Sequence, residues 1–249
     1  MAKLEAGSYS AFAGGNASNN GTAIEQQWYP PLDHCTTTLG CIGPYEALYN
    51  ALDDLIIRLQ NSTTSDLAQT AIFAKLGTNA SGKTYTTKGF LLYLTSNRPT
   101  FYNGFLSTYC YSALEPIADP NALCNKLPTP LIKTVEDFLT KDPTGKDADA
   151  ITGTPSTPLL VFFSPQMMLG ANSTGYNNLG KNLGNEGIIF HEALHGFTGQ
   201  SDFTILDELG LNSLQYASCS ISVRIQKKVL LLSTPKIDPT IASPCSTGD

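Results

Sequence analysis

Apolar residues recur at helical spacing in several stretches of this chain. The leucines between Pro44 and Gln60 follow a period of about 3.6 residues, which predicts an amphipathic helix. A second helix is predicted from Ser65 to Leu76, where Gly77 provides a stop signal. The segment from Leu131 to Lys141 has the same pattern over a shorter length. These stretches predict a mainly helical protein.

Continuous apolar runs predict strands in two other places. Leu159–Phe163 has the composition of a buried strand, and the run Phe90–Leu94 predicts another within 83–96. A helix is predicted around 100–114. The stretch 141–158 is rich in Asp, Gly, Thr and Pro, which is typical of a loop or linker.

A further helix is predicted at about residues 185–197, and Gly196 and Gly199 help to end it. Its apolar residues share one side of the helix: Phe190, Ala193, Leu194 and Phe197. A helix at 203–216 follows, and 224–232 extends it. The fold class expected is therefore α+β, mainly helical, with a small mixed sheet packed beside the helix at 185–197.

The other side of that helix carries the sequence His191-Glu192-Ala193-Leu194-His195, an H-E-x-x-H motif. On a helix the two histidines fall about 40° apart and one turn apart, so both imidazoles can bind one metal ion. Glu192 lies about 100° from His191, where its carboxylate can reach a metal-bound water. With only three histidines in the chain, chance would produce this motif in roughly one chain in a thousand.

Two histidines do not complete a zinc site, which needs at least a third protein ligand and a water. The remaining histidine, His34, is expected to be an ordinary loop residue. Three carboxylates follow the motif, and we favour Asp202 over Glu208 and Asp207. A competing use for Asp202 is to cap a helix that begins at Phe203.

The stretch from His191 to Asp202 resembles the H-E-x-x-H-x-x-T-G-x-x-D pattern of aspartate-type zincins, which include secreted bacterial effector proteases. The resemblance covers about a dozen residues. It implies a zincin-like metallopeptidase domain with one zinc ion per chain. In that family pattern His191, His195 and Asp202 are the metal ligands and Glu192 is the general base.

Two related families fit less well. In metzincins the glycine comes three residues after the second histidine, whereas Gly199 comes four after His195. No methionine follows Met168, so the downstream Met-turn of metzincins is excluded. Thermolysin-like gluzincins have glutamate in an E-x-x-x-D frame, whereas Glu208 is followed four residues later by Asn212.

The length of 249 residues suits one compact domain with an appended segment, or two small domains. We expect a flexible N-terminal arm at residues 1–22 and a single zincin-like catalytic domain at 23–249. Hydrophobic residues make up 41% and charged residues only 14%, against a usual quarter. The net charge of −6 provides no basic stripe for nucleic acid or membrane lipids. No apolar run reaches the ~20 residues that span a bilayer. The expected partner is a peptide or protein substrate, and the expected state is a monomer.

Six cysteines form an even set without a C-x-x-C pair, which favours disulfides over a second metal site. Among the connectivities that six cysteines allow, we favour pairing between neighbours: Cys35–Cys41, Cys110–Cys124 and Cys219–Cys245. Disulfides indicate a secreted or extracytoplasmic protein. The stretch after Met1 lacks an apolar signal-peptide core, so a mature form is expected. The alternative is a cytosolic protein with six free thiols.

These patterns predict a secreted zinc-dependent endopeptidase. Tyr216 and Tyr176 are candidates for stabilising the oxyanion. The strand at 159–163, or its neighbour, is a candidate to hold the substrate backbone by β-augmentation. One alternative function is a metal-binding or recognition module without peptidase activity. Another is a zinc hydrolase of non-peptide amides or esters.

Overall fold

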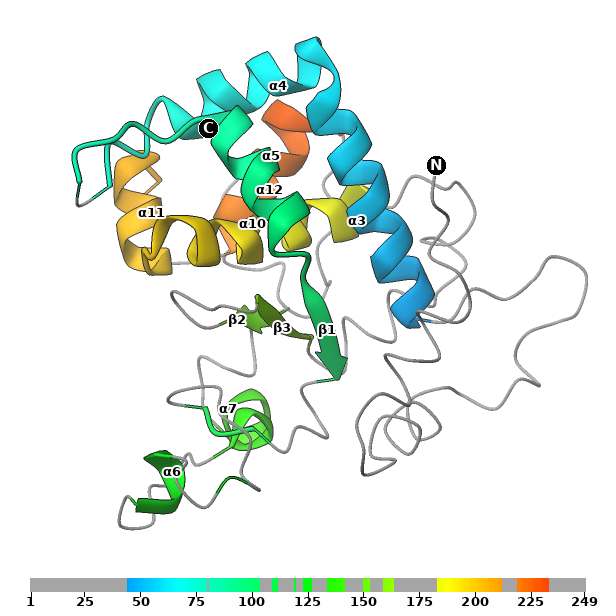
Figure 1. Ribbon diagram of the computed structural model, residues 1–249, viewed down its shortest axis with the longest axis vertical. Coiled ribbons are helices and arrows are strands. Elements are labelled where there is room, and N and C mark those ends of the chain that lie inside the picture. The colour runs from blue at the N-terminus through cyan, green and yellow to red at the C-terminus, as the bar shows by residue number, and fades with distance from the viewer. Residues whose placement is uncertain are drawn as a thin grey trace, which may run out of the picture.

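The computed structural model describes residues 44–79, 81–103, 109–111, 119, 123–126, 134–141, 150–152, 159–163, 183–211 and 219–232. The predicted N-terminal arm at residues 1–22 lies outside these residues. Figure 1 shows most of the described helices around one central helix, with a small sheet beneath them.

Helix α3 (Pro44–Gln60) has the bounds that the apolar periodicity predicts. Its buried leucines lie three or four residues apart and form one face: Leu48, Leu52, Leu55 and Leu59. The prediction of this helix is confirmed.

The next helical segment consists of α4 (Ser62–Ala68) and the π-helical turn η2 (Gln69–Phe73). It begins three residues before the predicted start because the side chain of Asn61 accepts a hydrogen bond from the Thr63 backbone N–H. Gly77 follows with a φ of 63°, a left-handed conformation that glycine adopts without strain. The helical segment ends at Phe73, three residues before the predicted end at Leu76, and Gly77 follows the turn at 74–76.

The strand predicted within 83–96 is wrong, because the chain forms helix α5 (Thr87–Ser96) there. Thr86 caps the helix by accepting a hydrogen bond from the Gly89 N–H. Phe90 and Leu94 are buried, while Leu92 between them is 66% exposed. A short apolar run suits a strand or a helix, and here one helical face packs on the core while the other meets solvent.

The helix predicted around 100–114 is also wrong where the structure describes it. Thr100–Asn103 form strand β1, and Tyr109 and Cys110 lie outside any helix. Phe101 on this strand is fully buried, with its ring 4.7 Å from that of Tyr49 and 5.4 Å from that of Phe163. Aromatic packing against a neighbouring strand and helix thus selects the extended backbone.

The sheet has three strands in the order β1-β3-β2. The central strand β3 (Leu160–Phe163) confirms the strand predicted at 159–163. It pairs in parallel with β1 and antiparallel with β2 (Ala150–Thr152), which lies within the predicted loop at 141–158. The sheet is therefore small and mixed.

Two short helices, α6 (Leu123–Lys126) and α7 (Val135–Lys141), lie beyond the sheet in Figure 1. Within the segment predicted at 131–141, α7 begins at Val135 because Thr134 and Asp137 exchange hydrogen bonds at the helix start. Cys110 is buried and disulfide-bonded. The side chains of the other five cysteines lie outside the described part, so the three pairings stay predictions.

Helix α10 (Leu183–Thr198) is the centre of the fold and extends the predicted helix at 185–197 by two residues at its start and one at its end. It contacts α3, α5, α12, η5 and β2. Every residue from Gly184 to Gly196 is buried, so the helix is enclosed on all sides and not on one face as its sequence suggested. Gly196 lies inside the helix, and Gly199, with a φ of 72°, follows its end.

Three elements complete the described chain. Helix α11 (Asp202–Glu208) begins one residue before the predicted start and ends early, and Gly210 follows it with a φ of 70°. Helix α12 (Cys219–Arg224) continues into the π-helical turn η5 (Ile225–Val229). Residues 212–218, which include part of the helix predicted at 203–216, lie outside the described residues.

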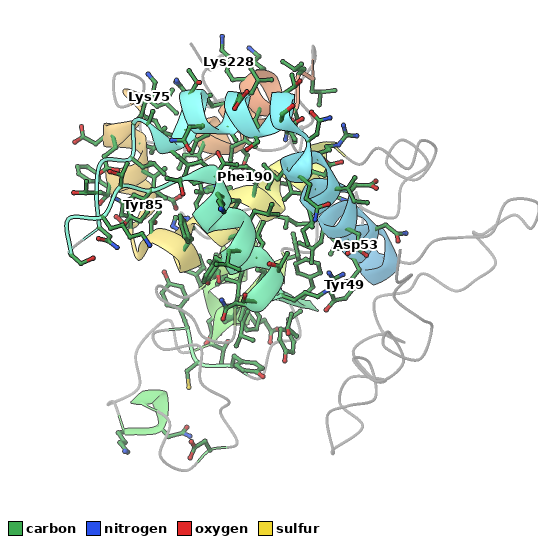
Figure 2. The ribbon with its side chains drawn as sticks, turned by 45° about the horizontal axis from the view of Figure 1, so that its top comes forward. Tyr49, Asp53, Lys75, Tyr85, Phe190 and Lys228 are labelled. Carbon is green, nitrogen blue, oxygen red and sulfur yellow. The ribbon has the colours of Figure 1, made fainter. Side chains whose placement is uncertain are left out.

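The core surrounds Phe190 on α10. Its ring lies 4.6 Å from that of Phe90 and 6.0 Å from that of Phe73, and Figure 2 shows it among the helices while Lys75 and Lys228 point outward. The described chain is mainly helical with one small mixed sheet, as the α+β class requires. Among the described helices, none combines the length and apolar character that crossing a membrane requires.

Candidate metal centre

The two histidines of the H-E-x-x-H motif lie side by side on α10. Their ring centroids are 4.9 Å apart, which follows from their separation by one helical turn. Both are buried, with 5% of His191 and 7% of His195 exposed. The helix geometry expected from the sequence is therefore present, although the histidines face the interior.

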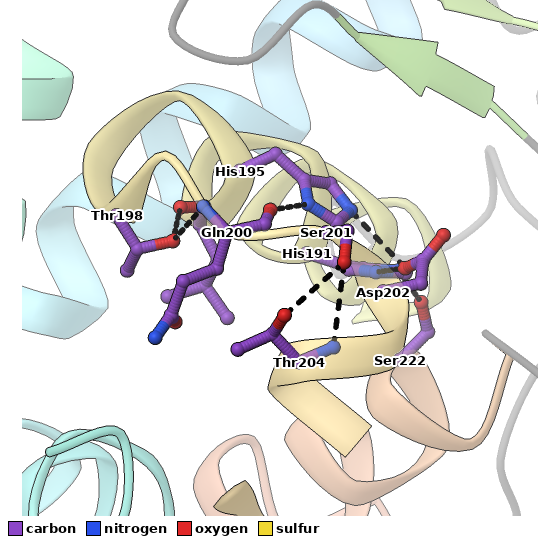
Figure 3. Close-up of polar contacts among 9 residues, drawn as sticks. His191, His195, Thr198, Gln200, Ser201, Asp202, Thr204 and Ser222 are labelled. Atoms are coloured by element: carbon purple, nitrogen blue, oxygen red, sulfur yellow. Dashed lines mark hydrogen bonds and ion pairs between the residues drawn. The ribbon is translucent and has the colours of Figure 1, made fainter. Parts of the chain in front are cut away.

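Asp202 reaches this pair from the first turn of α11. Its Oδ1 lies 2.8 Å from His191 Nε2 and 3.1 Å from His195 Nε2 (Figure 3). The three side chains form a group in which one nitrogen or oxygen of each lies within 4.8 Å of the others. The Asp202 side chain is 47% exposed, so the group lies where the buried helix meets the surface.

The turn between α10 and α11 directs Asp202 toward the histidines. Gly199 reverses the chain in a left-handed conformation, and its N–H donates to the carbonyl of His195 at 2.8 Å. The Thr198 hydroxyl donates to the Leu194 carbonyl at 2.7 Å and accepts from the Gln200 N–H at 3.2 Å. These bonds, drawn in part in Figure 3, hold the turn in one shape.

Capping of α11 does not compete for the Asp202 carboxylate. Ser201 is the N-cap, and its side chain accepts a hydrogen bond from the Thr204 N–H. The helix starts at Asp202 and not at Phe203, so the carboxylate is available to the histidines.

The Nδ1 atoms of both imidazoles, which do not face Asp202, have polar partners. His195 Nδ1 donates to the carbonyl of Gln200 at 2.8 Å, and His191 Nδ1 lies 3.1 Å from the Ser222 hydroxyl on α12. A carbonyl only accepts, so His195 Nδ1 carries a proton, and Nε2 of the same ring points to Asp202. Metal-binding histidines usually have such partners, which fix the ring and leave the other nitrogen for the metal.

His195 and Asp202 each stabilise the charged form of the other. Burial disfavours a charged His195, but the hydrogen bond and charge of Asp202 outweigh it and raise the pKa of His195 to about 9. Burial likewise disfavours a charged Asp202, but the hydrogen bonds from His191 and His195 outweigh it and lower the pKa of this carboxyl. The carboxylate stays negative and attracts a cation, which competes with the protons on the two Nε2 atoms.

Glu192 lies beside the group in the interior. Its carboxyl interacts electrostatically with His191, His195 and Asp202, and only 5% of the residue is exposed. Burial raises the pKa of Glu192, and the two histidines partly oppose that shift. A buried carboxyl whose pKa is raised is well suited to exchange protons.

The donor atoms fit a divalent metal ion. Bonds of about 2.0–2.1 Å in a tetrahedral site place donor atoms about 3.3 Å apart, so the separations of 2.8 and 3.1 Å need to widen by only tenths of an ångström. Two imidazoles and one carboxylate suit zinc and other divalent first-row metals. Among the described residues the group has three members, which leaves a coordination position for water.

The other candidate residues are not in this group. Glu208 lies at the end of α11, where its carboxylate accepts from the Gln200 side chain. Asp207 is exposed on the same helix and does not join the three donors. His34, Tyr176 and Tyr216 lie outside the described residues.

Sequence reasoning did not find the partners of the two histidines. Gln200 lies within the T-G-x-x-D stretch, but it takes part through its backbone carbonyl, which any residue has. Ser222 lies 31 residues beyond His191 and has no motif around it. Tyr85, whose hydroxyl donates to the Thr198 carbonyl at 3.0 Å, is equally remote in sequence.

Comparisons with protein-family models, with curated proteins and with solved structures found no match to this chain.

Proposed function

We propose that this chain is a secreted zinc-dependent endopeptidase of the zincin class. One observation carries the proposal: the Nε2 atoms of His191 and His195 and Oδ1 of Asp202 converge while the carboxyl of Glu192 lies beside them. The zincin-like fold is part of the same proposal, and the central helix with its H-E-x-x-H motif beside a mixed sheet supports it.

The presence of Glu192 favours a hydrolase over a structural metal site. A structural zinc site has four protein ligands and has no use for a neighbouring base. Here the described residues provide three donors, and a buried carboxyl lies next to them. Hydrolysis needs this combination of an incomplete protein ligand set and a base.

In the reaction, His191, His195 and Asp202 hold the metal and Glu192 moves protons. When bound, zinc supplies a Lewis acid that acidifies water and polarises the carbonyl of the scissile bond. Glu192 accepts a proton as the water oxygen bonds to the carbonyl carbon. It then delivers that proton to the amide nitrogen as the C–N bond breaks.

The sheet offers a way to hold an extended peptide. Strand β3 is central, so the strand at 159–163 is not itself an edge. Of the three described strands, β1 and β2 are the outer ones, and β2 contacts α10. We propose β2 as the strand along which the substrate backbone pairs.

Metal content and activity together test the proposal. Wild-type protein purified without chelator should contain one zinc per chain. Asp202→Ala should lose most of this zinc. Glu208→Ala should still bind one zinc per chain when zinc is in excess. Glu192→Gln should keep the zinc and lose casein hydrolysis by about 100-fold or more, because general-base catalysis contributes that much. Glu136→Gln, the same change on α7, is the matched control and should remain active.

Other outcomes point elsewhere. Casein hydrolysis by Glu192→Gln at the wild-type rate would remove Glu192 as the base. Chelator-sensitive cleavage of small esters without casein hydrolysis would indicate a non-peptide hydrolase. Bound zinc without either activity would indicate a binding module, and a wild type that binds no metal would contradict the proposed site.

A further inference from the structure

Glu208 ends helix α11 and holds the turn that leads into that helix. The Nε2 of Gln200 donates to both carboxylate oxygens of Glu208, each at 2.9 Å. The backbone carbonyl of the same Gln200 accepts the Nδ1–H of His195 at 2.8 Å. One residue therefore connects the Glu208 carboxylate to the imidazole of His195.

Among the described residues, none other than Gln200 hydrogen-bonds to the Glu208 carboxylate. No described lysine or arginine forms an ion pair with it. A negative charge in the last turn of a helix also meets the negative end of the helix dipole, which is unfavourable. A neutral side chain at this position would stabilise α11 better.

The observed orientation of the Gln200 side chain is also unfavourable for its amide oxygen. Its Oε1 is buried and has no hydrogen-bond partner among the described residues, although its Nε2 is satisfied by Glu208. A freely rotating glutamine would hydrogen-bond to water with both groups. The orientation of this side chain is therefore set by Glu208.

The neighbouring segments leave room for this contact. A side-chain carbon at Gly77 would lie 3.7 Å from Glu208 Oε1, so the turn after η2 passes close to the carboxylate. Tyr85 follows that turn, and its hydroxyl donates to the carbonyl of Thr198 at 3.0 Å. The turn from Thr198 to Ser201 is thus held both by Tyr85 and by Glu208.

We propose that Glu208 is a positioning residue of the metal centre, acting through Gln200 to hold the His195 ring with Nε2 toward the metal. The proposal rests on the metal site described under the proposed function. Glu208, which the sequence suggested as an alternative third metal ligand, then has a positioning role and is not a ligand. Outer partners of metal-binding histidines commonly contribute about 10–100-fold to metal affinity.

The test measures zinc affinity by competition with a chromophoric chelator for wild type, Glu208→Ala, Gln200→Ala and the double variant. Each single variant should bind one zinc at saturation with affinity reduced about 10–100-fold. The double variant should bind no more weakly than Glu208→Ala, because both changes remove the same contact. Glu208→Gln, which keeps one acceptor for Gln200, should recover much of the affinity.

Asp207→Ala is the matched control, because it removes one negative charge from the adjacent position of the same helix. It should bind zinc as wild type does. A spectroscopic measurement accompanies the affinities: the absorption of the cobalt-loaded protein should change in Glu208→Ala and Gln200→Ala and stay constant in Asp207→Ala. A role limited to stability would lower the melting temperature without changing this spectrum.

Three results would overturn the proposal. Wild-type affinity in both single variants would show that the contact does not position His195. Loss of stoichiometric zinc in Glu208→Ala, with retention in Gln200→Ala, would make Glu208 a ligand. A wild type that binds no zinc would reject the metal site itself, and this differs from the first result, in which the site binds zinc normally. If Glu208→Ala does not fold, Gln200→Ala and Glu208→Gln still test the contact.

Discussion

Gly196 is a residue at which helix α10 lies very close to its neighbours. A side-chain carbon there would clash with the Tyr93 hydroxyl on α5 and lie 2.9 Å from Leu159 Cδ1 beside β3. The absence of a side chain lets Tyr93 and Leu159 pack against α10 one residue away from His195. Glycine is needed here for close packing and not to end the helix.

Gly196→Ala should therefore lower the free energy of unfolding by about 1–3 kcal/mol, the usual cost of adding volume to a packed core. Urea denaturation monitored by circular dichroism measures the loss. In a Tyr93→Phe background, which removes the hydroxyl, the same change should cost less. Equal costs in the two backgrounds would show that the Tyr93 hydroxyl does not limit the space.

At the scale of elements, Arg58 and Glu186 connect α3 to the first turn of α10. Arg58 Nε lies 2.9 Å from Glu186 Oε2, and the Glu186 side chain is fully buried. Burial disfavours the charged carboxylate more than Arg58 favours it, so the pKa of Glu186 rises from 4.5 to about 7. In the unfolded chain the carboxyl is ordinary, so the folded protein binds more protons between these two pH values.

The free energy of unfolding should consequently fall as pH rises from about 4.5 to about 7, by up to about 3 kcal/mol from this residue. Glu186→Gln does not titrate and should lack this part of the pH dependence. Urea denaturation of metal-free wild type and variant at pH 5 and pH 7.5 gives the difference. The same slope in both proteins would mean that Glu186 ionises normally in the folded state.

The helices and strands also show which secondary structure can be predicted from local sequence alone. The leucines of the 17-residue helix α3 keep one period from Leu48 to Leu59, which the alternation of a strand cannot match, so the sequence predicts this helix with its bounds. The apolar run at 90–94 and the segment at 100–103 are short enough to suit either backbone. Packing on Phe190 made the first a helix, and pairing with β3 made the second a strand.

At the scale of the whole molecule, α10 is held by contacts on all sides, whereas α11 is short and joins it through the turn at 199–201. A metal ion bound by His191, His195 and Asp202 would connect the two helices. Binding to the folded chain alone stabilises that chain in proportion to the free ligand concentration relative to Kd.

Zinc should therefore raise the melting temperature of the metal-free protein, with a stabilisation of about 4 kcal/mol at a free zinc concentration 1,000 times Kd. Differential scanning calorimetry with buffered zinc measures the shift, and chelator should reverse it. Magnesium, which prefers oxygen ligands, should have little effect, and zinc should not stabilise Asp202→Ala. An equal shift with magnesium would indicate a general effect of divalent ions.

Features that depend on local periodicity can be predicted from the amino-acid sequence. Helix geometry brings His191, Glu192 and His195 close together wherever the helix lies in the fold, and the period of the leucines defines α3. The tertiary structure decided which carboxylate meets the histidines, because that depends on the turn at Gly199 and on the capping of α11 by Ser201. It also supplied Ser222 from α12 and gave Glu208 its contact with Gln200. Such contacts join segments through packing, so the spacing of residues along the chain does not encode them.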